Sequence, residues 1–360
     1  MVRVIRTALL VVVMLDALIL PAIWPSLVVV AHAVHFPWDQ GHDTFLPEFG
    51  DLDTDPGDSN CNSTASPFEV ATGNFLHTST DLFMPALGPD FDITRTYNSR
   101  DRRSGPFGRA WTFTYDQRLI ETTDGVSLFV ICRQGNGKRE RFVQNPDGTY
   151  TAPPDLAAVL VKHADGTLTL TEQDGAQRRF DTDGRLMAWV ERHGKTMTMR
   201  YDDTGFLLSL SDANGRTVAF TKGGNGKIAS VTDPAGQVFR YDYDTDGNLV
   251  GATDPLGSTT RYVYDAKHNL VRVIDPLDHV VQQASYDERG RVQTFTEQGE
   301  TWTVSYFPDQ KKTTKQDSRG NAWTYFYNDN RNITRVVDPV GKRLDFAYNA
   351  NFNLSSITDN

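Results

Sequence analysis

Cysteine is scarce in this sequence, which holds only Cys61 and Cys132 among its 360 residues. Two cysteines so far apart lack the paired spacing of a zinc site. In an exported protein they can form one disulfide bridge, and two unpaired thiols are the alternative. The motifs His-Glu-x-x-His and Gly-x-Ser-x-Gly, which mark zinc proteases and serine hydrolases, are also absent. We therefore expect no metal, no cofactor and no catalytic residue, and we interpret the chain as a protein that is not an enzyme.

The sequence also has no excess of positive charge. Its 36 lysines and arginines are outnumbered by 46 acidic residues, which gives a net charge of -10, and both signs are mixed along the chain. Binding to a phosphate backbone needs a basic face. Nucleic acid is therefore not expected as a partner.

Residues 1–33 have the pattern of a leader. Two arginines precede a mostly apolar stretch, residues 7–30, which is followed by Ala-His-Ala. This order is typical of a secretory signal peptide, here cleaved after Ala33. About 20 apolar residues also suffice to cross a bilayer, so a membrane anchor is an alternative, and a mis-assigned start is another. We expect a secreted, cell-surface or periplasmic protein that meets the membrane through its leader alone.

After the leader, the sequence contains no convincing amphipathic helix. Residues 34–65 are rich in Asp, Pro and Gly and predict a linker. Residues 66–120 contain alternating, aromatic-rich runs, which predict a small β domain. Residues 121–200 carry repeated Asp-Gly pairs, which predict hairpins with both central turn residues at positive φ. The expected fold class is therefore all-β.

The strongest signal is an internal repeat of about 21 residues over positions 201–360. In one unit, residues 237–243 alternate as a strand, and residues 248–253 form a second strand after an Asp-Thr-Asp-Gly turn. Asp254, Pro255 and Gly257 then occupy the first, second and fourth positions of a turn, as a type I turn prefers. The tyrosines that mark the period are Tyr243, Tyr264, Tyr286, Tyr306, Tyr327 and Tyr348.

Successive units of this kind predict a long antiparallel ribbon. Such a ribbon has to coil in order to bury its apolar face. With one tyrosine per unit, we expect the tyrosine rings to stack as a ladder of cross-strand neighbours.

The units resemble the YD repeats of the rearrangement-hotspot (Rhs) family, Tyr-Asp-x-x-Gly-x-Leu-x-x-x-x-Asp-Pro-x-Gly. The stretches YVYDAKHNLVRVIDPLD (residues 262–278) and FYNDNRNITRVVDPVG (residues 326–341) fit closely. Upstream, Ala-Thr-Gly-Asn at residues 71–74 and Gly-Pro-Phe-Gly at residues 105–108 resemble the domain that commonly precedes these repeats. The residues that define the repeat are Tyr243, Asp254, Pro255, Gly257, Tyr264, Asp275, Pro276, Tyr327, Asp338, Pro339 and Gly341.

The resemblance, which covers residues 66–360, implies a partial β-shell. Such a shell is a non-catalytic scaffold, similar to the N-terminal part of a polymorphic toxin that encapsulates a C-terminal toxin. The sequence ends within a repeat at Asn360, so we expect the repeats to be truncated and the toxin, or the remaining shell segment, to be a partner outside this chain. A surface module that binds carbohydrate, cell wall or a partner protein is the alternative.

Overall fold

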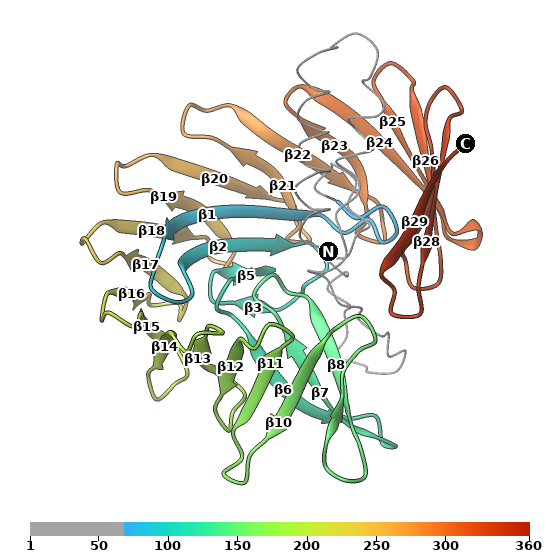
Figure 1. Ribbon diagram of the computed structural model, residues 1–360. Coiled ribbons are helices and arrows are strands. Elements are labelled where there is room, and N and C mark those ends of the chain that lie inside the picture. The colour runs from blue at the N-terminus through green and yellow to red at the C-terminus, as the bar shows by residue number, and fades with distance from the viewer. Residues whose placement is uncertain (1–67) are drawn as a thin grey trace, which may run out of the picture.

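A computed structural model describes residues 68–360 (Figure 1). The predicted leader, the predicted linker and Cys61 lie outside the described residues. The fold class predicted from the sequence is confirmed, because strands dominate and the described chain holds one short 3-10 helix, η2 (Pro308–Gln310). Within residues 68–360, no helix is long and apolar enough to cross a membrane.

The N-terminal part of the described chain forms three small sheets. A three-stranded antiparallel sheet, here called the inner sheet, has the strand order β1-β2-β5. A short hairpin, β3-β4, lies between β2 and β5 in the chain, and a four-stranded sheet, β6 to β9, follows β5. The bounds are β1 (Leu76–Met84), β2 (Phe91–Asn98), β3 (Ser104–Gly105), β4 (Gly108–Arg109), β5 (Trp111–Phe113), β6 (Arg118–Thr123), β7 (Leu128–Arg133), β8 (Arg139–Gln144) and β9 (Tyr150–Thr151).

The rest of the chain forms one antiparallel sheet of 20 strands, here called the ribbon, in which each strand pairs with the next in sequence. The end strands β10 and β29 do not pair with each other, so the sheet is not closed. The ribbon starts at Ala158, well before the predicted start of the repeats at residue 201. Its strands are β10 (Ala158–Lys162), β11 (Leu168–Glu172), β12 (Gln177–Phe180), β13 (Leu186–Val190), β14 (Thr196–Tyr201), β15 (Leu207–Ser211), β16 (Thr217–Lys222), β17 (Ile228–Thr232), β18 (Val238–Tyr243), β19 (Leu249–Thr253), β20 (Thr259–Tyr264), β21 (Leu270–Ile274), β22 (Val280–Tyr286), β23 (Val292–Glu297), β24 (Glu300–Phe307), β25 (Lys312–Asp317), β26 (Ala322–Tyr327), β27 (Ile333–Val337), β28 (Arg343–Tyr348) and β29 (Leu354–Asp359).

Alternation along each strand directs one face of the ribbon to the core. In β18, Phe239 and Tyr241 are buried while Arg240 between them is exposed. In β16, Val218 and Phe220 are buried while Ala219 between them is exposed. Because successive side chains of a strand point to opposite faces, the period of two in the sequence defines an inner and an outer face of the ribbon.

A regular defect curves the ribbon. The pairing register shifts by one residue where a strand reaches its repeat tyrosine, as between Asp242 and Tyr243 and again between Val263 and Tyr264. Such a bulge bends its strand and increases the local twist. The same shift recurs at Tyr201, Tyr286, Tyr327 and Tyr348. A bend repeated on alternate strands makes the sheet coil around an axis instead of staying flat.

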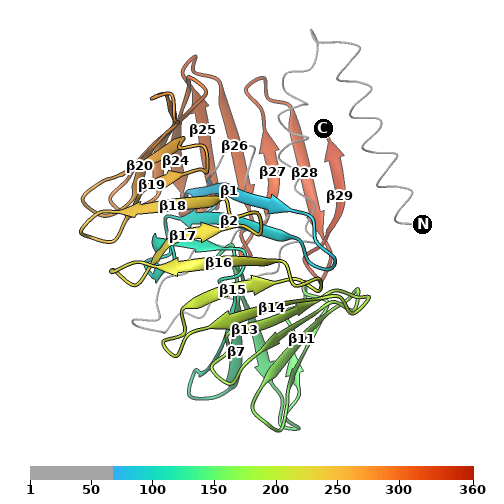
Figure 2. The ribbon, with the colours of Figure 1, turned by 90° about the vertical axis from the view of Figure 1, so that its left-hand side faces the viewer.

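The inner sheet lies within this coil. Figures 1 and 2 show β1 and β2 running alongside β16 to β22, with the ribbon turning around them. Buried apolar residues form one continuous cluster, from Phe68 ahead of the inner sheet to Val336 in β27. The core of the molecule is therefore the layer between the inner sheet and the concave face of the ribbon.

The turns differ from the prediction for the Asp-Gly pairs. In the loop after β8, Gly148 has a φ of 85°, but Asp147 does not have a positive φ. The N–H of Gly148 donates to the carbonyl of Asn145 at 3.0 Å, so the pair occupies the last two positions of a four-residue turn. The prediction of positive φ at both positions was wrong, because a wider turn needs only its final glycine in the left-handed region.

The predicted tyrosine ladder was also wrong. Tyr243 lies across from Leu249 and Tyr264 lies across from Leu270, and Tyr306 lies across from Thr313, so these tyrosines do not face one another. The tyrosine of the next unit is two strands away, a distance of about 10 Å. One tyrosine per two strands therefore cannot place the rings side by side.

Candidate functional site

The repeat tyrosines fasten neighbouring hairpins at one rim of the ribbon. The hydroxyl of Tyr243 donates to the carbonyl of Ile228, the first residue of the preceding strand, at 2.7 Å. Equivalent bonds of 2.7–2.9 Å are made by Tyr201, Tyr264, Tyr286, Tyr306 and Tyr348. Burial raises the pKa of Tyr243 and Tyr264 well above the ordinary value, so these hydroxyls stay protonated as donors. Tyr327 of β26 lies next to the Thr313 side chain of β25 instead.

The aspartates of the Asp-Pro turns organise the opposite rim. Asp254 Oδ1 accepts the N–H groups of Leu256 and Ser258, both at 2.8 Å, and the Gly257 N–H donates to the Asp254 carbonyl at 3.0 Å. The turn at Asp275-Pro276 and the turn at Asp338-Pro339-Gly341 repeat this arrangement. In the former, Asp278 takes the glycine position with a φ of 69°. These repeat-defining residues therefore shape turns and do not converge on one site.

A buried arginine holds the inner sheet against the ribbon. Arg95 of β2 is fully buried, and its guanidinium donates to both carboxylate oxygens of Asp81 at 2.6 and 2.8 Å. It also donates to the hydroxyl of Tyr262 of β20 at 3.2 Å. Tyr241 of β18 donates to Asp81 Oδ2 at 2.7 Å. The charge of Arg95 is thus balanced inside the core by groups from both sheets, as a buried ion pair requires.

Aromatic contacts extend this junction along the inner sheet. The Trp111 indole N–H donates to the Tyr264 hydroxyl at 2.8 Å, and the backbone N–H of Leu270 donates to the Tyr97 hydroxyl at 2.9 Å. The His77 ring lies 2.7 Å from the Gln282 side-chain oxygen. Burial lowers the pKa of His77 to about 4, so this ring is neutral at pH 7. We interpret the junction as structural, since most of its polar groups hydrogen-bond one another, while His77 Nε2 is buried without a partner.

Two glycines of the upstream motifs mark close contacts with the ribbon. Gly73 has a φ of 72°, and a Cβ there would lie 2.5 Å from the Cβ of Arg291. Gly108 has a φ of 107°, and a Cβ there would lie 2.8 Å from the Gly247 carbonyl oxygen. Glycine is needed at both places because the backbone is left-handed and the approach is tight.

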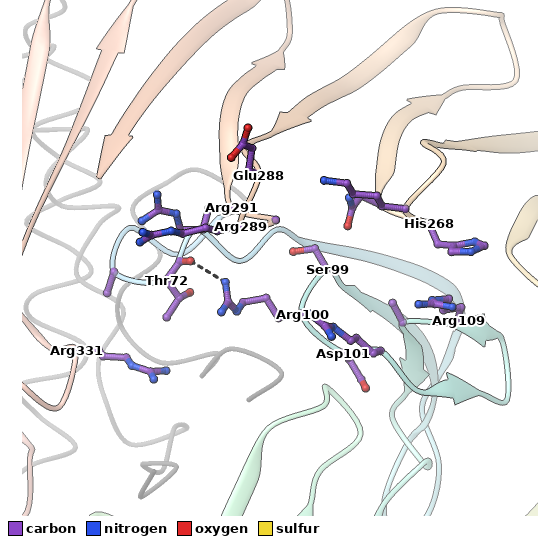
Figure 3. Close-up of a pocket in the computed structure, with 16 residues that line it drawn as sticks. Thr72, Ser99, Arg100, Asp101, Arg109, His268, Glu288, Arg289, Arg291 and Arg331 are labelled. Atoms are coloured by element: carbon purple, nitrogen blue, oxygen red, sulfur yellow. Dashed lines mark hydrogen bonds between the residues drawn. The ribbon is translucent and has the colours of Figure 1, made fainter. Parts of the chain in front are cut away.

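A large pocket lies between the segment after β2 and three turns of the ribbon (Figure 3). It has a volume of about 770 Å³ and is here called the arginine pocket. Seven of its lining residues are basic and two are acidic. The basic residues are Arg100, Arg102, Arg109, Lys267, Arg289, Arg291 and Arg331, and the acidic residues are Asp101 and Glu288.

Local contacts position some of these side chains. The Arg100 guanidinium donates to the Thr72 carbonyl at 3.2 Å, which Figure 3 shows as a dashed line. Arg291 is paired with Asp287 at 2.7 Å and lies over the Tyr306 ring. Asp101 is engaged by Arg103 outside the pocket. The guanidinium groups that line this pocket can bind carboxylate or phosphate oxygens.

The second pocket has a volume of about 730 Å³ and is here called the paired pocket. It also lies at the rim of the repeat tyrosines. Several of its basic residues have carboxylate partners, with Arg133 on Asp116 at 2.8 Å and Lys222 on Asp202 at 3.4 Å. Arg185 bridges Asp181 and Asp183 at 2.7 Å each. These basic side chains are therefore neutralised by nearby aspartates.

The described part of the chain holds one cysteine and no cluster of potential metal ligands. Residues 68–360 contain no group of three or more His, Cys, Asp or Glu side chains placed to hold a metal ion. Cys132 in β7 is fully buried, and burial raises the pKa of its thiol to about 12. Because Cys61 lies outside the described residues, the disulfide between them stays a prediction.

Sequence reasoning did not find the arginine pocket. The run Ser-Arg-Asp-Arg-Arg at residues 99–103 is a visible local signal of basic charge. Lys267, Arg289 and Arg331, however, lie in three different turns spread over 65 residues. The coil of the ribbon brings these turns to the same opening, and no spacing rule for one strand or helix indicates this.

Residues 109–360, well over half of the chain, match the family model described as Teneurin YD-shell. The chain belongs to the teneurin YD-shell family. It is thus an Rhs/YD-repeat protein, as the motifs indicated, and its coiled ribbon is a β-shell scaffold of that class. Residues 65–142 match a second model, described as a domain of unknown function (DUF6531).

Curated relatives share a smaller part of the YD-shell chain. The tRNA nuclease WapA of Bacillus subtilis (strain 168) is 29% identical over 123 residues, which are 34% of this chain and 5% of WapA. The tRNA3(Ser)-specific nuclease WapA of Bacillus spizizenii matches to the same extent. The match thus spans a small fraction of the length of these relatives.

Solved structures that resemble the chain include two of TcdB2-TccC3. The complex named TcdB2-TccC3-Cdc42 is 13% identical and has a TM-score of 0.37, covering 69% of this chain and 17% of that one. TcdB2-TccC3 without the hypervariable C-terminal region is 9% identical and has a TM-score of 0.38, covering 80% and 19%.

Proposed function

We propose that this YD-shell chain is a non-catalytic part of a shell wall that encloses another polypeptide outside the cytoplasm. The enclosed partner is a toxin segment or a further segment of the shell. Support comes from membership of the YD-shell family together with the coiled form of the ribbon.

One observation carries the proposal. The inner-face position occupied by Val273 in β21 and Val336 in β27 is occupied by Ile357 in β29. Val273 and Val336 are 2% and 4% exposed, whereas Ile357 is 46% exposed. Apolar groups that line the inner face of a sheet are stabilised when another surface covers them. The exposed inner face near β29 therefore fits a covering polypeptide.

Site-specific photo-crosslinking tests this function. Benzoylphenylalanine replaces Ile357 on the inner face in the full chain, produced in its native cells, and crosslinked products are identified by mass spectrometry. The matched control replaces Leu256, which is 91% exposed in the turn after β19. We expect a crosslinked polypeptide at position 357 and little or none at position 256.

The opposite pattern would contradict the proposal. If position 357 captures no polypeptide, or no more than position 256, the inner face does not enclose a partner. The alternative from the sequence, a surface module for carbohydrate, cell wall or a partner protein, stays a prediction, as do the signal peptide and export.

A further inference from the structure

The arginine pocket carries unbalanced positive charge. Its seven basic and two acidic lining residues contrast with a net charge of -10 for the whole chain. Within residues 68–360, the side chains of Arg102, Arg109, Lys267 and Arg289 take part in none of the ion pairs. The paired pocket, of nearly equal volume at the same rim, has five basic and three acidic lining residues, and three of its basic side chains pair with nearby aspartates. The arginine pocket therefore carries the larger excess of positive charge of the two.

The turns at the arginine pocket also depart from the repeat. The last position of the tyrosine-side turn is a glycine at positive φ in several units, including Gly205, Gly226 and Gly247. At the pocket this position is His268 in one turn and Arg331 in another, with φ of 65° and 63°. A non-glycine residue costs about 1 kcal/mol or more in this region. Both side chains line the pocket, whereas the third turn at the pocket keeps Gly290. Outside the pocket, Phe352 holds the same turn position with a φ of 59°.

The same chain contains a segment of opposite charge that is close in sequence to the first residues of the pocket. Residues 34–65 hold no lysine or arginine and seven acidic residues, all between positions 39 and 58. The acidic residues are Asp39, Asp43, Glu48, Asp51, Asp53, Asp55 and Asp58. The chain then enters the described structure at Phe68, and Ala71 and Thr72 already line the pocket.

Chain length permits the contact. Asp58 precedes Ala71 by thirteen residues, which in extended form span roughly 40 Å. A segment tethered this close has a high effective concentration at the pocket compared with a free ligand. Carboxylates on it match the bidentate geometry that guanidinium groups favour.

We propose that the acidic segment, residues 39–58, docks in the arginine pocket of its own chain. This contact would hold the polypeptide ahead of the inner sheet at the rim of the shell, through carboxylate–guanidinium pairs. The inference concerns the outside of the rim and is independent of what the shell encloses.

Zero-length carbodiimide crosslinking of the full chain tests this contact, because it joins a lysine amine to a carboxylate only when they touch. Lys267 is the reporter, since it is the one lysine that lines the pocket. Two contacts within the structure serve as positive controls: Lys222 with Asp202 at 3.4 Å and Lys162 with Glu121 at 2.6 Å. We expect peptides that join Lys267 to residues 39–58.

Two variants make the result specific. Replacing Asp51, Asp53, Asp55 and Asp58 by asparagine should remove most of the Lys267 product. The triple variant R102E/R109E/R289E keeps the reporter and should lower the yield by about fivefold or more, because it reverses the attraction. Arg102 and Arg289 are exposed and Arg109 is half-buried, so the variant should fold, as its unchanged Lys222–Asp202 product will verify.

Three results would overturn the proposal. Lys267 could link only to its neighbours Asp265 and Glu288 while both control products form. The triple variant could leave the yield of the long-range product unchanged. In a mixture of ¹⁴N- and ¹⁵N-labelled chains, the product could join two different chains, which would make a second copy the occupant.

Discussion

Two regions of the ribbon have the same repeat but different surroundings. Strands β18 to β23 face the inner sheet, and their inner positions Leu249, Leu270 and Val292 are fully buried. Strand β29 has Leu354 at the equivalent position, where it is half-buried, and the residues that follow it are exposed. The repeat therefore produces a strand with one apolar side. That side becomes part of a core only where another surface covers it.

The largest loss of folding stability is expected at the junction between the inner sheet and the ribbon. Changing Arg95 to Met removes a fully buried cation and leaves Asp81 without its ion-pair partner, which should cost about 3–5 kcal/mol of unfolding free energy. Urea denaturation followed by circular dichroism measures this cost.

The matched control lies in the less covered region. Arg335 pairs with Asp345 at 2.6 Å, but its side chain is 41% exposed. Changing Arg335 to Met should cost less than about 1 kcal/mol, as for other exposed pairs. Equal costs for the two variants would mean that the inner sheet does not bury its arginine in solution.

A second comparison uses one repeat position in both regions. Changing the fully buried Leu249 to Ala should cost about 2–4 kcal/mol, because it removes buried methyl groups and leaves a cavity. The same change at half-buried Leu354 should cost about 1 kcal/mol or less. The denaturant midpoints of the two variants, measured in parallel, test whether the costs differ in this way. A cost at Leu354 as large as that at Leu249 would show that β29 is covered.

A third prediction concerns the pH dependence of folding stability, through His77 of the inner sheet. The pKa of His77 is lowered from 6.5 to about 4, so between these values the unfolded chain binds a proton that the folded chain does not. Stability from this group is therefore full above pH 6.5 and is lost as the pH falls toward 4. From pH 6.5 to pH 5 the loss should be on the order of 1–2 kcal/mol.

The measurement is the unfolding free energy of wild type and of His77→Gln at several pH values. The difference between the two proteins should shrink as the pH falls through this window. The variant His163→Gln, at an exposed turn after β10, is the control and should follow wild type. A constant difference between wild type and His77→Gln would show that His77 does not titrate as its burial implies.

The smallest expected effect concerns the tyrosine rim. Tyr243→Phe removes the bond to the Ile228 carbonyl and should cost about 1 kcal/mol. Tyr348→Phe removes the equivalent bond to the Ile333 carbonyl near the end of the ribbon. We expect a smaller cost there, because water replaces a lost partner more readily at a less covered rim. Thermal melts of both variants provide the test, and a larger shift for Tyr348→Phe would contradict the comparison.

The turn geometry shows how far sequence reasoning reached. Asp254, Pro255 and Gly257 were placed in a turn from their residue types, and the structure has Asp254 accepting two backbone N–H groups there. The tyrosine ladder failed because the period was counted along the chain and not across the sheet. Tyr243 reaches a carbonyl on the neighbouring strand instead of another ring.

Strands, turns and the apolar face of the ribbon were determined by the sequence alone, because turn chemistry and the period of two act between residues close in the chain. Only the tertiary structure decided which equivalent leucines are buried, since this depends on whether a distant sheet covers them. It likewise decided that Arg109, Lys267 and Arg331 share one pocket. Their meeting follows from the accumulated bend of many bulges, and no single repeat contains that information.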